Sequence, residues 1–311
     1  MLCDRLGRRA FLGGTVAAWG CLSTSRGALA QPDVWPPHRL VWEMMSPKGV
    51  EIYLAPTIHV IARSNPALPT AIEQRMPKSN VILIEADVTD KKDLAKHVAL
   101  WTYPSSDDSA LKHLSPQTSD ALRNYLDERK VPAADILKLK PWAIQSIVLF
   151  IELKRAGLGT PSSAESLIVS TAKALSKPIQ CLESLEAQGR LFDSFPSDIA
   201  DLRLRDAVTD VTSPVERRQN LIELTEAWYA GSWEKLKSVS DKLNSSPEEV
   251  RAFVDRVVIL ERNKSFADKL DALASTMQPG AAVMISVGFR HYVGKNGLVQ
   301  LLEDRGYRLK Q

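Results

Sequence analysis

Short apolar runs alternate with long amphipathic stretches along this chain of 311 residues. Four runs have the length and β-branched content of buried strands, although a run this short is also compatible with a buried helix. They cover residues 50–55, 81–84, 178–182 and 281–287. Another run, 40–45, precedes the first across a Ser-Pro-Lys-Gly turn, which predicts an antiparallel hairpin. A last short strand is expected at residues 307–309.

Helical spacing of apolar residues fills the rest of the chain. The stretches with this spacing are 68–76, 92–101, 115–130, 141–156, 184–192, 213–229, 232–243, 247–277 and 297–304. Strands near both ends with helices between them predict an α/β (α+β) fold. We expect a central mixed β-sheet built from both chain ends, flanked by helices, with a large helical middle segment at residues 91–277. Such a sheet requires the two ends of the domain to meet in space.

Residues 1–30 have the pattern of a secretory signal peptide: an arginine-rich start, an apolar stretch and a small-x-small cleavage site. The Arg-Arg pair at 8–9 lies in a run that resembles the twin-arginine export signal of bacteria. We therefore expect a periplasmic or otherwise exported protein whose domain covers residues 31–311. A retained signal anchor and a lipoprotein linked through Cys21 are the alternatives.

Loss of the signal peptide also changes the charge. The full chain has 40 Lys+Arg and 37 Asp+Glu, and residues 1–30 hold four Arg and one Asp, so 36 of each sign remain. A chain of net charge near zero lacks the basic surplus of nucleic-acid-binding proteins. Cys181 is the one cysteine left, which excludes a disulfide framework. We expect a small-molecule or peptide substrate, no nucleic acid, and no membrane span after signal removal.

Four side chains capable of chemistry follow predicted strands: His59, Glu85, Glu183 and His291. If the strands are parallel, their carboxyl ends meet at one edge of the sheet. Two imidazoles with one or two carboxylates form a ligand set suited to Zn, Mn, Co or Fe. Such a site can acidify a bound water for hydrolysis, and a carboxylate off the metal can act as general base. Taken singly, a histidine or glutamate in this position is more often a hydrogen-bonded loop residue or a helix-start residue than a ligand.

Arg262 and Asn263 follow an apolar face within the long predicted helix at 247–277. An inward-pointing arginine can hold a carboxylate or an oxyanion, because its planar fork matches such groups. The alternative is an exposed helix arginine. The three other histidines, at positions 38, 97 and 113, lie in polar or helical surface contexts and receive no functional assignment.

Several sequence blocks, taken in order, resemble the TraB/GumN family. The blocks are Thr57-Ile-His59, Leu83-Ile-Glu85, Pro141-Trp142, Leu182-Glu-Ser-Leu-Glu-Ala-Gln188, Trp228-Tyr-Ala-Gly231, Arg262-Asn263, the run from Val287-Gly-Phe-Arg-His291 to Leu298, and Leu301-Leu-Glu-Asp-Arg-Gly-Tyr307. The resemblance implies a fold shared with the Tiki and erythromycin-esterase-like groups. It also implies a site built on two Gly-x-x-His motifs with glutamates.

The resemblance implies a metal-dependent hydrolase, with peptide bonds among the candidate substrates and Mn, Co or Zn as the ion. By position, His59, Glu85 and His291 would be metal ligands, and Glu183 and Arg262 would be catalytic. A non-catalytic periplasmic protein that binds a metal, a small ligand or a peptide through a degenerate site is the alternative. Glu186 matches the second glutamate of the Leu-Glu-x-x-Glu block without a defined role.

The first histidine motif departs from the family pattern. It reads Pro56-Thr-Ile-His59 where the family has glycine at the first position. Glycine allows a positive φ or a close backbone approach, whereas proline allows neither and lacks the N–H donor. We expect the spacing of His59 from its strand to be kept and the geometry at this ligand to differ.

Overall fold

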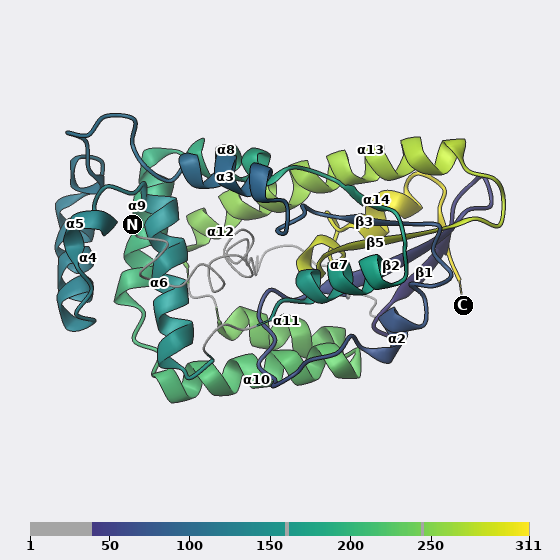
Figure 1. Ribbon diagram of the computed structural model, residues 1–311, viewed down its shortest axis with the longest axis horizontal. Helices are drawn as coiled ribbons and strands as arrows, with labels where there is room; N and C mark the ends of the chain where they lie inside the picture. Colours follow the sequence, from purple (N-terminus) through teal and green to yellow (C-terminus); the bar gives the residue numbers. More distant parts are fainter. Residues whose placement is uncertain (1–38, 159–161, 244–245, 311) are drawn as a thin grey trace.

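A computed structural model describes residues 39–158, 162–243 and 246–310 of the protein (Figure 1). Its centre is a mixed β-sheet in which the strands follow the order β4-β3-β5-β2-β1-β6. The strands are β1 (Trp42–Met45), β2 (Glu51–Thr57), β3 (Val81–Ile84), β4 (Ile179–Cys181), β5 (Ala282–Gly288) and β6 (Arg308–Leu309). A mixed sheet flanked by helices confirms the predicted α/β class.

Parallel pairing joins β4, β3, β5 and β2, whereas β1 is antiparallel to both β2 and β6. Every residue of β3 and β5 is buried, which explains why these strands read as continuous apolar runs rather than alternating ones. Met44 of β1 pairs with Leu309 of β6. Both ends of the domain therefore build one sheet, as predicted.

Helices make up most of the remaining chain. They are α2 (Thr70–Glu73), α3 (Lys91–Ala99), η1 (Ala110–Lys112), α4 (Pro116–Glu128), α5 (Ala133–Ile136), α6 (Pro141–Arg155), α7 (Ala164–Ala174), α8 (Leu185–Asp193), α9 (Ser197–Thr209), α10 (Pro214–Ala230), α11 (Trp233–Lys242), α12 (Glu248–Val254), η2 (Asp255–Leu260), α13 (Glu261–Thr276), η3 (Phe289–His291) and α14 (Leu298–Glu303). Local sequence sets several boundaries: α10 begins with Pro214 behind the capping hydroxyl of Ser213 and ends at Gly231 in the left-handed region.

Three α-helices, α5, α7 and α9, were absent from the predicted set, and one predicted helix is divided. α7 and α9 have incomplete apolar spacing; Asp201 and Arg203 of α9, for example, are buried although polar. The stretch 247–277 forms α12, the π-helical segment η2 and α13 in succession. π-Helical turns occur frequently at functional sites, and η2 ends two residues before Arg262.

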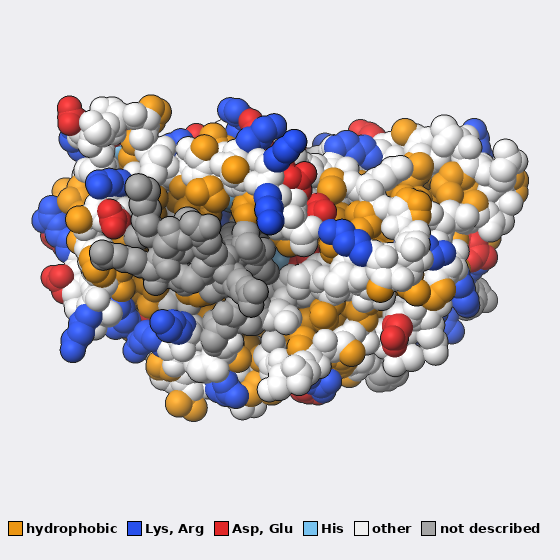
Figure 2. Space-filling model, in the orientation of Figure 1, with side chains coloured by type: hydrophobic (Ala, Val, Ile, Leu, Met, Phe, Trp, Pro, Cys, Tyr) orange, Lys and Arg blue, Asp and Glu red, His pale blue; other side chains and the backbone are white. Residues whose placement is uncertain are grey.

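Hydrophobic residues form two principal cores. The larger one packs the sheet against α7, α10, α11, α13 and α14. The other lies among α4, α6 and α9, at the opposite end of the elongated molecule in Figure 1. On the face shown in Figure 2, basic and acidic side chains are interspersed along the rim. A pocket lies between the carboxyl ends of the strands and α6, one of the helices that carry the smaller core.

The predicted signal peptide, its cleavage site and His38 lie outside the described residues. Among the helices of the described residues, none combines the length and the apolar character that crossing a membrane requires.

Candidate active site at the carboxyl edge of the sheet

The four side chains predicted from strand ends lie at the same edge of the sheet. Glu85 follows β3, Glu183 follows β4, His59 follows β2, and His291 follows β5, and these strands are adjacent and parallel. Gly288, the last residue of β5, marks where three of them meet. A methyl group built on Gly288 would lie 3.4 Å from Glu85 Oε1 and 3.7 Å from both His59 Nε2 and His291 Cδ2.

The protonation of His291 is fixed by its neighbours. The Asn263 amide nitrogen donates to the carbonyl oxygens of His291 and Asn296, at 3.0 and 2.8 Å. Asn263 Oδ1 is therefore an acceptor, and it lies 2.6 Å from His291 Nδ1, which must carry the proton. The lone pair on Nε2 faces Arg262 Nη1 at 3.1 Å. Burial, helped by Arg262 and opposed by Glu85, lowers the His291 pKa to about 3, so the ring is neutral at pH 7.

His59 is oriented in the same manner by a carboxylate. Its Nδ1 lies 2.9 Å from Glu165 Oε1, and its side chain is 27% exposed. Burial would lower the His59 pKa, but the charge and the hydrogen bond of Glu165 outweigh it, so the pKa is raised. With Nδ1 engaged, Nε2 is the nitrogen that points to Gly288. Glu165 was not predicted; its signal is a position in the first turn of α7, after the capping residue Ser163.

Glu85 is a buried carboxylate held from two sides. Its Oε1 accepts the backbone N–H of Gly288 at 2.6 Å, and its Oε2 accepts Arg262 Nη2 at 2.7 Å. Burial would raise the Glu85 pKa, but Arg262, His291 and His59 outweigh it and lower the pKa to about 2. Glu85 is therefore ionised at neutral pH, as a metal ligand or an electrostatic stabiliser requires.

Arg262 joins the acidic residues of the site. Its Nη2 donates to Glu183 as well as to Glu85, and its Nε donates to Glu183 Oε2 at 3.1 Å. Glu183 Oε1 also accepts the side-chain amide of Gln188 at 2.6 Å. Burial would lower the Arg262 pKa, yet the two carboxylates raise it above its usual value. Arg262 points inward from α13, which excludes the exposed alternative considered from the sequence.

The donor atoms suit a divalent cation in type and orientation. His59 and His291 each present Nε2 while an oxygen holds Nδ1, the arrangement that orients metal-binding histidines. In the described parts of the chain, however, no three His, Cys, Asp or Glu side chains form a ready metal group. The Arg262 guanidinium lies among Glu85, Glu183 and His291 instead. A metal at this point therefore requires Arg262 to release Nε2 of His291.

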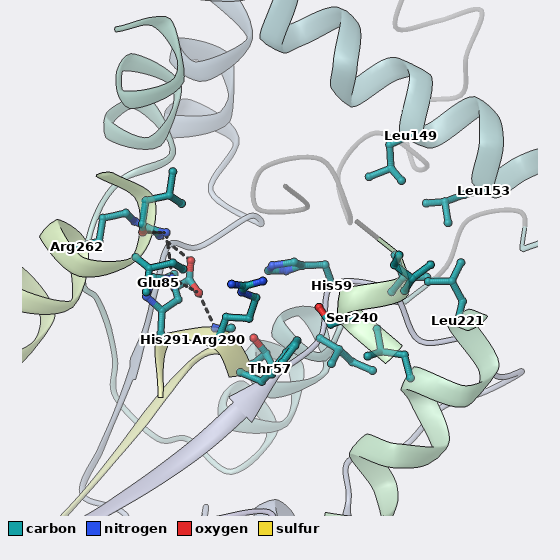
Figure 3. Close-up of a pocket in the computed structure, with 18 of the residues that line it drawn as sticks. Thr57, His59, Glu85, Leu149, Leu153, Leu221, Ser240, Arg262, Arg290 and His291 are labelled. Atoms are coloured by element: carbon teal, nitrogen blue, oxygen red, sulfur yellow. Dashed lines mark hydrogen bonds and ion pairs between the residues drawn. The ribbon is translucent and has the colours of Figure 1, made fainter. Parts of the chain in front are cut away.

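A cavity of about 140 Å³ opens next to these residues. In Figure 3, Arg262, Glu85 and His291 lie at one end of it, whereas Leu149, Leu153 and Leu221 lie at the other. Arg290 and His59 line the space between these ends in the same view. The cavity thus joins a charged end to an aliphatic one, as substrate pockets do.

Glu186, His97 and His113 do not line the cavity. Glu186 pairs with Arg190 at 2.7 Å and with Lys96 at 3.5 Å on the surface, so it continues its helix and does not face the site. The surface assignment of His97 is wrong, because its ring is buried against Trp101 and Trp142 and its Nδ1 lies 2.9 Å from the Leu185 carbonyl. His113 is half-exposed beside Asp108, as its surface context predicted.

Pro56 has no backbone N–H, but this costs no hydrogen bond to β1. The register of β1 with β2 ends at Leu54, and Pro56 is paired with Val287 of β5 alone. Its carbonyl accepts the indole N–H of Trp228 at 2.8 Å. The two histidine motifs are offset by one residue in the sheet. Gly288, the first residue of the second motif, pairs with Thr57 and not with Pro56, the first residue of the first motif. Proline is thus accommodated, and the first motif approaches the site differently from the second.

The chain is similar to proteins of one known family. A model of the TraB/PrgY/gumN family matches residues 40–311. The uncharacterized protein YbaP of Escherichia coli (strain K12) is 22% identical over 256 residues, which are 82% of this chain and 89% of that protein. The uncharacterized protein YbaP of Shigella flexneri is 22% identical over 250 residues, 80% of this chain and 87% of that protein. No solved structure gives a significant match.

Proposed function

The chain belongs to the TraB/PrgY/gumN family, and on that premise we propose that it is an exported, metal-dependent hydrolase. The observation that carries the proposal is the convergence of His59 Nε2, the His291 ring and Glu85 Oε1 around one point beside Gly288. Both imidazoles are held through Nδ1, so both offer Nε2. His59, His291 and Glu85 would hold the ion, which when bound supplies Lewis acidity and an acidified water.

The remaining residues have roles that need no ion. Asn263 and Glu165 fix the tautomers of the two histidines, and the Gly288 N–H holds one oxygen of Glu85. Arg262 provides a permanent positive charge for the oxyanion of a hydrolytic transition state. Glu183 positions Arg262 through two hydrogen bonds. When Arg262 turns toward the substrate, Glu183 is released to accept a proton, which is the general-base role.

A second candidate is a non-catalytic protein that binds a small ligand or a peptide at the same edge. The observation in its favour is that Arg262 already satisfies Glu85, Glu183 and His291. Such a network is complete without a cation, and the cavity beside it is formed. Under this candidate the pocket recognises its ligand and releases it unchanged.

One experiment separates the candidates. The purified protein is stripped with a chelator, reloaded with Mn, Co or Zn, and assayed for bound ion and for cleavage of a broad peptide library. The variants are His291→Ala and, as a control outside the site, His113→Ala, which is exposed beside Asp108. A hydrolase binds an ion and cleaves peptides, and loses both only with His291→Ala. Absence of cleavage, with or without a bound ion, supports the second candidate, and equal cleavage by wild type and His291→Ala overturns the proposed site.

A further inference from the structure

The aliphatic end of the cavity has a defined lining. Leu149 and Leu153 of α6 and Leu221 of α10 lie there, and Leu224, Val258 and Ile259 add to the apolar lining of the cavity. The whole cavity, charged end included, has a volume of about 140 Å³, slightly less than an engineered cavity of about 150 Å³ that binds benzene. Its aliphatic end therefore holds no more than one large aliphatic or aromatic side chain. Leu149 and Leu153 lie one helical turn apart on α6, so both face it.

Arg290 adds hydrogen-bond donors to this aliphatic lining. Its Nη2 donates to Asp255 Oδ1 at 3.2 Å. Its Nε and Nη1 are buried without a hydrogen-bond partner among the described residues, although Arg290 lines the cavity. Buried donors without partners are rare in folded proteins and call for an explanation. A ligand oxygen in the cavity would supply the missing acceptor.

The charges around Arg290 decide whether the ligand oxygen that it binds is a charged carboxylate or a neutral carbonyl. Asp255 already neutralises the guanidinium, and Arg217, which also lines the cavity, is paired with Asp210 at 2.6 Å. Neither arginine therefore has a surplus positive charge with which to compensate a buried carboxylate, and an uncompensated buried charge is costly. A neutral carbonyl oxygen accepts the same hydrogen bond without that cost.

We propose that the cavity recognises a leucine-type residue inside a peptide chain, with Arg290 donating to the neutral carbonyl oxygen of that residue. A residue with a free α-carboxylate is excluded by the same paired charges. The inference rests on the proposed function, in which this cavity receives the substrate. It adds the substrate class: peptides with a large aliphatic side chain at an internal or amidated position.

Binding to the chelator-treated full-length protein tests the proposal without turnover. The probes are acetyl-Gly-Leu-amide, acetyl-Gly-Ala-amide and acetyl-Gly-Leu with a free carboxylate, and their affinities are measured by ligand-observed NMR titration. The three extra carbons of leucine predict that the Leu amide binds at least about tenfold more tightly than the Ala amide. The Leu amide should also bind more tightly than its free acid. Equal affinities in either comparison overturn the inference.

Two variants link the binding to the named residues. Leu149→Phe narrows the cavity and should weaken binding of the Leu amide, whereas Ile151→Phe alters the same helix toward the other core and should not. Arg290→Lys keeps the positive charge beside Asp255 but removes the additional donor nitrogens of the guanidinium, and should also weaken binding of the Leu amide. Unchanged affinity in Arg290→Lys or in a folded Leu149→Phe contradicts the inference. Cleavage without a leucine preference refutes this inference alone; selective binding without cleavage refutes the hydrolase alone.

Discussion

Asn263 Oδ1 accepts the Nδ1 proton of His291 at 2.6 Å, so a residue of α13 decides which imidazole nitrogen faces the cavity. A flip of the Asn263 side-chain amide would break two hydrogen bonds, because its nitrogen donates to two backbone carbonyls. The Asn263 side chain from α13 and the segment after β5 are thus fixed relative to each other by these hydrogen bonds.

Asn263→Ala should weaken metal binding without unfolding the domain. The variant removes the acceptor that fixes Nδ1–H, and loss of such a supporting contact typically costs about 10- to 100-fold in metal affinity. Isothermal titration with Zn, Mn or Co measures the change. The exposed Asn124→Ala on α4 is the matched control and should bind as wild type does. If the two variants have equal affinity, Asn263 does not support a metal ligand.

Gly288→Ala should block the site while leaving the fold intact. Gly288 has φ of −53°, which alanine adopts readily, and its methyl group would make only contacts of 3.4 Å or longer. The free energy of unfolding should therefore change by no more than about 1 kcal/mol. The same methyl would lie between Glu85 Oε1 and His59 Nε2, where an ion is proposed. Metal titration and denaturant unfolding measure both effects, and a variant that binds metal normally would place the ion elsewhere.

Arg262→Met should destabilise the chelator-treated protein. It leaves the buried Glu85 and the partly buried Glu183 without their cation, and breaking a buried ion pair costs about 3–5 kcal/mol. A divalent ion would replace the lost charge, so its addition should stabilise this variant more than wild type. Thermal unfolding with and without the ion measures the difference. Arg305→Met is the control, because Arg305 pairs with Asp268 and Asp271 nearer the surface and should cost at most about 1 kcal/mol. An equal effect of the ion on Arg262→Met and wild type would contradict the prediction.

Acid should lower the free energy of unfolding, partly because His291 is protonated more readily in the unfolded state. Its pKa falls from 6.5 to about 3 on folding, so the unfolded state binds the extra proton as pH falls below 6.5. Stability is present above that pH and is lost on acidification, by about 2 kcal/mol between pH 7 and pH 5. Chelator-treated His291→Gln should have a flatter profile in denaturant unfolding. His59 has a raised pKa and stabilises at low pH, so His59→Gln should have a steeper one. Identical slopes in both variants would refute the assignment.

The residues at the strand ends were predictable because strand periodicity is local. A continuous apolar run such as Val81–Ile84 marks a strand buried on both faces, and Glu85 then necessarily follows its carboxyl end. Parallel neighbours bring such ends to one edge, so the approach of Glu85 and His291 could be expected before any coordinates. Export and metal use remain predictions, since residues 1–30 lie outside the described chain and the site roles await the experiments above.

The sequence by itself determined the α/β class, the meeting of both chain ends in one sheet, and which side chains follow its strands. These features depend on the local pattern of apolar and polar residues, which is written along the chain. Only the tertiary structure decided that Glu165 orients His59, that Arg262 lies among the acidic residues, and that Arg290 lines an aliphatic cavity. These contacts join helices far apart in sequence, and their geometry depends on packing between the elements, which no local pattern encodes.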